Sequence, residues 1–215
     1  GRPGPVLIDV PKDIANTKTL WREPEALDLP GYTAHRPVDP AALGIQPPWW
    51  VAGNLPYQLT GLLINRVFEL ERPPEAAVFM VQREVAARLA AQAGDWSLAT
   101  VAVRSIAAVE RLFDLPPDAF EPPPAVHSSV IRMRPERRLT GLQRRAILDL
   151  AKLVFQQRRK TLRHGVAHAL GGNAAATNEV IAAASLDPAR RPGTLDLDEW
   201  QLLAGAVAAV TGEPA

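Results

Sequence analysis

The chain has 215 residues, with 24 Lys and Arg against 23 Asp and Glu, a formal net charge of +1 and no cysteine. This length accommodates one full domain and a smaller one. The lack of cysteine excludes disulfides and thiolate metal sites and fits a reducing cytoplasm, and no apolar run is long enough to cross a bilayer, so no membrane contact is expected.

The first 44 residues differ in pattern from the rest. Residues 5–10 have the pattern of a short buried strand, which Pro11 ends. The stretch that follows is interrupted by Pro30, Pro37 and Pro40, so we expect it to be mostly extended. Residues 1–44 are therefore predicted to be a partly extended segment outside the main fold.

Strand and helix patterns alternate from residue 45 to residue 136, which predicts an α/β domain. The last two strands bracket proline-rich loops and are expected to pair antiparallel. The predicted strands are 49–53, 76–81, 109–115 and 126–133, and the predicted helices are 59–70, 84–91 and 98–106.

The pattern after Pro135 is wholly helical. Helices are predicted at residues 141–157, 161–170, 178–184 and 198–210, and the last one begins with an acidic first turn. Residues 137–215 therefore predict a small all-helical C-terminal domain.

An amide and an aromatic ring follow the predicted strand that ends near residue 53. Asn54 offers an acceptor carbonyl and Tyr57 a stacking face, at the edge of a sheet where open α/β folds bind ligands. The exocyclic amine of a purine suits this pair, since the carbonyl can accept from the amine while the ring stacks on the base. The alternative is a loop in which Asn54 caps the next helix and Tyr57 fills the core.

Basic residues concentrate between residues 131 and 163, where eleven Lys and Arg face only Glu136 and Asp149. Such a one-signed run is typical of a surface that binds RNA phosphates, although a solvated helix face would have a similar composition. The residues expected to contact RNA are Arg134, Arg137, Arg138, Arg144, Arg145, Arg158, Arg159, Lys160 and Arg163.

Asn54-Leu55-Pro56-Tyr57 resembles the catalytic motif of the ribosomal RNA adenine N(6)-dimethyltransferase family. Residues 80–89, 120–130 and 155–163 match the same family in the same order. The resemblance implies a Rossmann-like methyltransferase sheet, S-adenosylmethionine as cofactor, and ribosomal RNA of the small subunit as partner. Its substrate would be two neighbouring adenines near the 3′ end of that RNA, modified during ribosome maturation by a monomeric protein.

The expected chemistry is methylation of an adenine amine. We expect the Asn54 side chain and the Pro56 main-chain carbonyl to accept hydrogen bonds from the amine, which aligns its nitrogen with an electrophilic methyl group. Tyr57 would stack on one face of the base, and the resemblance places Phe120 on the other. The expected catalytic residues are thus Asn54, Pro56, Tyr57 and Phe120, and Asn54, Leu55 and Pro56 are expected to border the cofactor.

Residues 1–43 resemble a different family, the acetolactate synthases, over a piece that includes none of that family's catalytic positions. No glycine-rich turn of the kind that binds S-adenosylmethionine lies upstream of Asn54. We therefore expect a hybrid chain, formed by natural fusion or by an artefact of gene assembly, that binds the cofactor weakly and has impaired methyltransferase activity.

Two other functions remain open. The helical domain and the basic run could form a non-catalytic module that binds ribosomal RNA, or the chain could resemble the resistance-type methyltransferases of large-subunit RNA. His164 and His168 have the i, i+4 spacing of some zinc sites, but no third ligand accompanies them, and no metal is expected.

Overall fold

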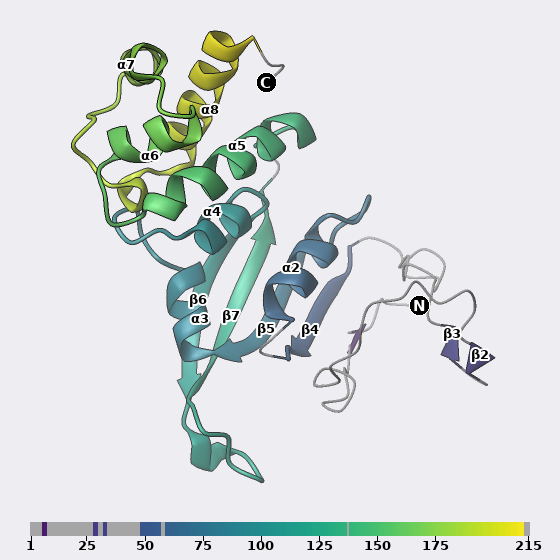
Figure 1. The fold of residues 1–215 in the computed structure, drawn as a ribbon. Coiled ribbons are helices and arrows are strands. Elements are labelled where there is room, and N and C mark those ends of the chain that lie inside the picture. The colour runs from purple at the N-terminus through teal and green to yellow at the C-terminus, as the bar shows by residue number, and fades with distance from the viewer. Residues whose placement is uncertain are drawn as a thin grey trace.

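The computed structural model describes residues 6–7, 28–29, 32–33, 48–56, 59–136 and 138–212. A mixed sheet with helices packed on it leads into a cluster of further helices (Figure 1). None of the helices in these ranges is long and apolar enough to span a membrane.

The main sheet has five strands in the order β1-β4-β5-β7-β6. The first three strands are parallel, whereas β7 is antiparallel to both of its neighbours. This confirms the predicted antiparallel pair at the end of the α/β region. The bounds are β1 Val6–Leu7, β4 Trp50–Asn54, β5 Ala76–Gln82, β6 Ala107–Leu115 and β7 Ser128–Pro135, with a separate antiparallel pair of β2 Asp28–Leu29 and β3 Tyr32–Thr33.

Three short helices cover one face of the sheet (Figure 1). They are α2 Thr60–Phe68, α3 Arg83–Leu89 and α4 Leu98–Arg104. Strand side chains alternate between faces, and the covered face carries Val51, Phe79 and Ile131, all at most 2% exposed. Their burial against Ile64 of α2 and its neighbours forms the first hydrophobic core.

The opposite face of the sheet, hereafter the open face, is not covered by a helix within residues 48–136. Trp50 is 59% exposed and Val78 is 36% exposed, and both alternate with buried neighbours along their strands. Ala52 pairs with Val78, and Asn54 pairs with Met80, so these side chains lie on the same face.

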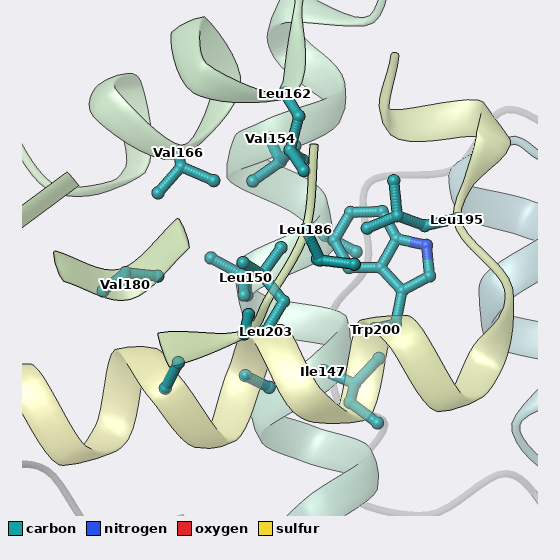
Figure 2. Packing of buried hydrophobic residues seen from close by; sticks show 14 of the residues in the cluster. Ile147, Leu150, Val154, Leu162, Val166, Val180, Leu186, Leu195, Trp200 and Leu203 are labelled. Carbon is teal, nitrogen blue, oxygen red and sulfur yellow. The ribbon is translucent and has the colours of Figure 1, made fainter. Parts of the chain in front are cut away.

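The helical part consists of α5 Gly141–Val154, α6 Leu162–Ala169, α7 Ala174–Ala183 and α8 Leu197–Thr211, with 3-10 turns at Phe155–Gln157 and Pro192–Thr194. Its core surrounds the fully buried Trp200 (Figure 2). Trp200 stacks on Phe155 with the ring centroids 5.5 Å apart. Thr140 and Asp196 cap α5 and α8 through their side chains.

The α/β architecture with a helical C-terminal part confirms the predicted fold class. Helix α7 was predicted to begin at residue 178 but begins at Ala174, where Asn173 accepts a hydrogen bond from the Ala176 N–H at 3.1 Å. A run of alanines shows no apolar periodicity, so the pattern did not reveal this first turn. The boundaries at residues 44 and 136 stay predictions.

The sheet and the helical part meet at Trp96, in the loop between α3 and α4. Its side chain is buried in the core of the helical part, and its indole N–H donates to the Ala91 carbonyl at 3.1 Å. The Gly193 carbonyl accepts from the Gly94 and Trp96 N–H groups at 3.1 and 2.9 Å. A Cβ atom at Gly193 would lie 2.7 Å from the Trp96 carbonyl oxygen, so this close approach requires glycine.

Candidate active site

Asn54 ends strand β4 at the carboxyl edge of the sheet. Its side chain is exposed, and strand alternation places it on the open face beside Met80. The next residue, Leu55, is buried, and its N–H donates to the Met80 carbonyl at 3.0 Å. The N-cap of α2 is Leu59, so the alternative in which Asn54 caps this helix is not supported.

The Pro56 carbonyl is used to start helix α2. Its oxygen accepts from the Leu59 N–H at 3.0 Å and from the Thr60 hydroxyl at 3.2 Å. A carbonyl oxygen has two lone pairs, and both are engaged here. The structure therefore does not support the predicted role of Pro56 as an acceptor for substrate. The Leu55 carbonyl has no hydrogen-bond partner among the described residues, which makes it the better backbone candidate.

Phe120 lies on the hairpin between β6 and β7 and is partly exposed. Leu115 at the end of β6 and Gln82 at the end of β5 both pair with Ser128, so the hairpin extends beyond the carboxyl ends of β4 and β5 (Figure 1). Phe120 and Asn54 thus share one edge of the sheet. Two strand spacings, roughly 10 Å, separate β4 from β7. Tyr57, the other predicted stacking residue, lies outside the described residues.

A polar network fixes the base of this hairpin. The Asp114 carboxylate accepts from the Ser129 hydroxyl at 2.6 Å and from the Arg111 Nε–H at 2.9 Å. The hydrogen bond from Arg111, followed by that from Ser129, lowers the pKa of Asp114 below its usual 3.8. The Arg83 N–H donates to the His127 carbonyl at 3.0 Å and ties α3 to the same hairpin. Sequence reasoning missed Asp114 and Ser129, because their contact depends on the strand register.

Among the predicted RNA-binding residues that the structure describes, Arg144 differs from the rest. Its side chain points inward and is hydrogen-bonded to three side chains of the α/β part. Arg138 is exposed and pairs with Glu136 at 3.4 Å, and Arg137 lies outside the described residues. The remaining members are exposed: Arg134 on β7, Arg145 on α5, Arg158, Arg159 and Lys160 in the turn after α5, and Arg163 on α6.

Comparison with known proteins identifies the family of this chain. The family model described as ribosomal RNA adenine dimethylase matches residues 13–199. The chain belongs to this family. The match begins inside the segment predicted to resemble acetolactate synthases, and that second resemblance is not borne out.

Curated relatives of this chain are bacterial proteins named ribosomal RNA small subunit methyltransferase A. The protein of Dehalococcoides mccartyi is 36% identical over 163 residues, which are 75% of this chain and 56% of the relative. The protein of Anaeromyxobacter dehalogenans is 41% identical over 170 residues, which are 76% of this chain and 59% of the relative. The chain thus spans less than two thirds of the length of these relatives.

Two solved structures share the fold of this chain. A dimethyladenosine transferase from Plasmodium falciparum has a TM-score of 0.61 at 22% identity, covering 72% of this chain and 65% of that one. The 23S rRNA methyltransferase ErmE has a TM-score of 0.57 at 20% identity, covering 75% of this chain and 66% of that one. At these identities the likeness supports the architecture alone.

S-adenosylmethionine, which the family implies, has a positively charged sulfonium group. The Asn54 amide oxygen and the Leu55 carbonyl lie at the carboxyl edge of a parallel strand, where such a ligand binds in open α/β sheets. These two acceptors fit the end of the cofactor that carries the methyl group.

His164 and His168 each have a polar side chain of the protein within hydrogen-bond distance. Thr161 Oγ1 lies 2.9 Å from His164 Nδ1, and Gln156 Oε1 lies 2.8 Å from His168 Nε2.

Proposed function

We propose that this dimethylase chain methylates the N(6) amine of adenines in small-subunit ribosomal RNA, twice per base, during ribosome maturation in the cytoplasm. Membership of the family and the names of the curated relatives support this proposal over a large-subunit target or a non-catalytic module. The observation that carries it is the exposed Asn54 amide at the carboxyl edge of β4, on the same edge as Phe120. We propose that the chain acts as a monomer.

The Asn54 side chain and the Leu55 carbonyl would hold the adenine amine. The lone pair of this amine is delocalised into the ring, so it is a poor nucleophile. Two accepted hydrogen bonds orient the nitrogen and make its pyramidal form easier to reach. S-adenosylmethionine would supply the electrophilic methyl group. The methylated ammonium loses a proton to water, so no general base is required of the chain.

Stacking would hold the base outside its helix. Phe120 would contact one face of the adenine and Tyr57 the other. Each stacked base contributes about 1–3 kcal/mol, which is comparable to the cost of unstacking it. The network of Asp114 and Ser129 at the hairpin base would keep Phe120 close to its working position.

Phosphate contacts would come from Arg158, Arg159, Lys160 and Arg163, which are exposed around the turn between α5 and α6. We expect the triple substitution of Arg158, Arg159 and Lys160 by Gln to weaken RNA binding. The slope of log K against log salt should become shallower by up to about three, since each lost phosphate contact removes slightly less than one unit. Filter binding at several salt concentrations measures this slope. The control Arg88→Gln removes an exposed charge on α3, and an equal effect there would contradict the assignment.

Transfer of a labelled methyl group from S-adenosylmethionine to small-subunit RNA tests the function directly. Asn54→Ala should lower the rate at least about 100-fold, the usual loss when one charge-stabilising partner is removed. The control Asn178→Ala changes an exposed Asn on α7 and should leave the rate unchanged. Equal rates in the two variants would refute the role of Asn54, and primer extension would reveal a large-subunit target.

We also propose that residues 1–215 by themselves bind S-adenosylmethionine weakly, because residues 1–53 contain no glycine-rich turn. Calorimetric titration of the full chain with S-adenosylmethionine tests this. A dissociation constant in the micromolar range would contradict it.

A further inference from the structure

We infer that Arg144 is a positioning residue that holds the helical part, helix α2 and the Asn54 loop in one fixed arrangement. The inference concerns a residue that the sequence assigned to RNA contact. Its consequence for catalysis rests on the function proposed above, whereas its structural content does not.

The guanidinium of Arg144 contacts two other helices at once. Its Nη1 donates to Glu69 Oε1 at 2.7 Å, and its Nη2 donates to Asn65 Oδ1 at 2.9 Å, both on the last turn of α2. Its Nε donates to the Ser105 hydroxyl at 3.0 Å, at the C-cap of α4. The Arg144 side chain is only 19% exposed.

The electrostatics of this site favour a cation. Glu69 and Ser105 are the C-cap residues of α2 and α4, so Arg144 lies where the partial negative charges of two helix dipoles meet. A planar guanidinium can direct separate N–H groups at three acceptors, which a lysine ammonium on a flexible stem does less well. The neighbouring Arg145 is exposed. The two arginines therefore differ in their surroundings because they lie on different faces of α5.

Helix α2 connects this contact to the candidate active site. The helix begins directly after the Asn54 loop, and its first turn is bonded to the Pro56 carbonyl through Leu59 and Thr60. Ile64 and Phe68 of α2 are buried in the sheet core, so we expect the helix to shift as one unit. A shift of α2 at its Arg144 end would therefore displace the Leu55 and Asn54 acceptors at its other end.

The Asn65 side chain reinforces this rigidity. Its Oδ1 accepts from Arg144 while its Nδ2 donates to the Gly61 carbonyl at 2.9 Å, one turn earlier in α2. The Ser105 hydroxyl likewise donates to the Ala102 carbonyl at 2.7 Å while accepting from Arg144. Two of the three acceptors of the guanidinium, Asn65 and Ser105, are thus themselves held in place.

Hydrogen exchange of backbone amides in the full chain tests the structural part. In Arg144→Met we expect exchange at Leu55, Leu59 and the amides of α2 to rise at least tenfold, with a smaller rise in Arg144→Lys. The matched control Arg66→Met removes an exposed charge from α2 itself and should leave these amides unchanged. Equal behaviour of Arg144→Met and Arg66→Met, or a rise spread equally over α7, would overturn the inference.

The catalytic consequence is tested by measuring kcat and the RNA concentration for half-saturation separately in Arg144→Met. With saturating ribosomal RNA, Arg144→Met should lower kcat about tenfold, while the RNA concentration for half-saturation stays within twofold. A weaker affinity for RNA with unchanged kcat would mean that Arg144 is a phosphate contact after all. If the wild-type chain transfers no methyl group, the proposed function fails, and the exchange at Leu55 and Leu59 still decides the role of Arg144.

Discussion

The Asp114 carboxylate joins the two strands at the base of the hairpin between β6 and β7. The carboxylate bonds to Ser129 across the β6–β7 pair and to Arg111 three residues earlier. Both partners favour the ionised form, which is why the pKa of Asp114 is lowered. Protonation would weaken both contacts together.

The hairpin should therefore loosen in acid. The pKa of Asp114 is lower in the folded than in the unfolded chain, so its stabilising contribution is present above the unfolded value of 3.8 and is lost as pH falls through the folded value. Between pH 6 and pH 3, urea unfolding should show a smaller loss of stability for Asp114→Asn than for the wild type. Glu199, whose pKa Arg190 lowers, contributes equally to both proteins. Parallel curves for both would contradict the role of Asp114.

Two residues of the motif show where sequence reasoning reached its limit. The exposed Asn54 amide at a strand end was predictable, since strand length and the apolar run fix where β4 stops. The use of the Pro56 carbonyl by Leu59 and Thr60 was not, because it depends on the path of the chain into α2. The inward turn of Arg144 was not predictable either, because it depends on the packing of α5 against α4 and on the position of the end of α2.

At the level of elements, the periodic patterns in the sequence predicted where the helices and strands lie. They did not predict which elements contact one another. A strand pattern specifies which side chains share a face, but it does not name the partner strand. The position of β7 between β5 and β6 is therefore known only from the structure. Similarly, the pattern of α6 does not reveal that Gly165 lies directly against Val154 of α5.

Two helical glycines provide a matched pair of tests. A Cβ atom at Gly165 would lie 2.7 Å from Val154 Cγ1 and 3.2 Å from the Val154 carbonyl oxygen, whereas one at Gly205 on α8 would meet nothing within 4 Å. Gly165→Ala should lower the free energy of unfolding by about 1–3 kcal/mol through overpacking. Gly205→Ala should raise it by about 0.5–1 kcal/mol, since alanine favours a helix interior. Urea denaturation measures both, and the same sign for the two variants would be inconsistent with the α5–α6 contact.

For the whole molecule, two buried side chains of the α/β part, Val101 of α4 and Trp96, belong to the core of the helical part. Trp96 is the larger of the two. It extends from the α3–α4 loop into a core made largely by α5 to α8, and Arg104 lies 6.0 Å from the centre of its ring. The two hydrophobic cores share no residue. Trp96 and Arg144 thus join the two parts at separate points, one apolar and one polar.

Trp96→Ala should lower the free energy of unfolding by about 3–5 kcal/mol, the usual cost of emptying such a site. Because one of the contacts between the two parts is lost, calorimetry should show the single transition split or broadened. Trp50→Ala is the control, since Trp50 is 59% exposed and its loss should cost little. A single sharp transition in Trp96→Ala would indicate that other contacts unite the two parts.

The fluorescence of Trp50 can report whether the open face is covered. Trp50 projects from it into water, so its fluorescence should be emitted at long wavelength. Binding of another protein, or of another copy of the chain, to this face would bury the indole. Its emission maximum would then shift to shorter wavelength. Difference spectra between the wild type and Trp50→Phe would isolate this signal from the other tryptophans and detect such a covering layer during purification.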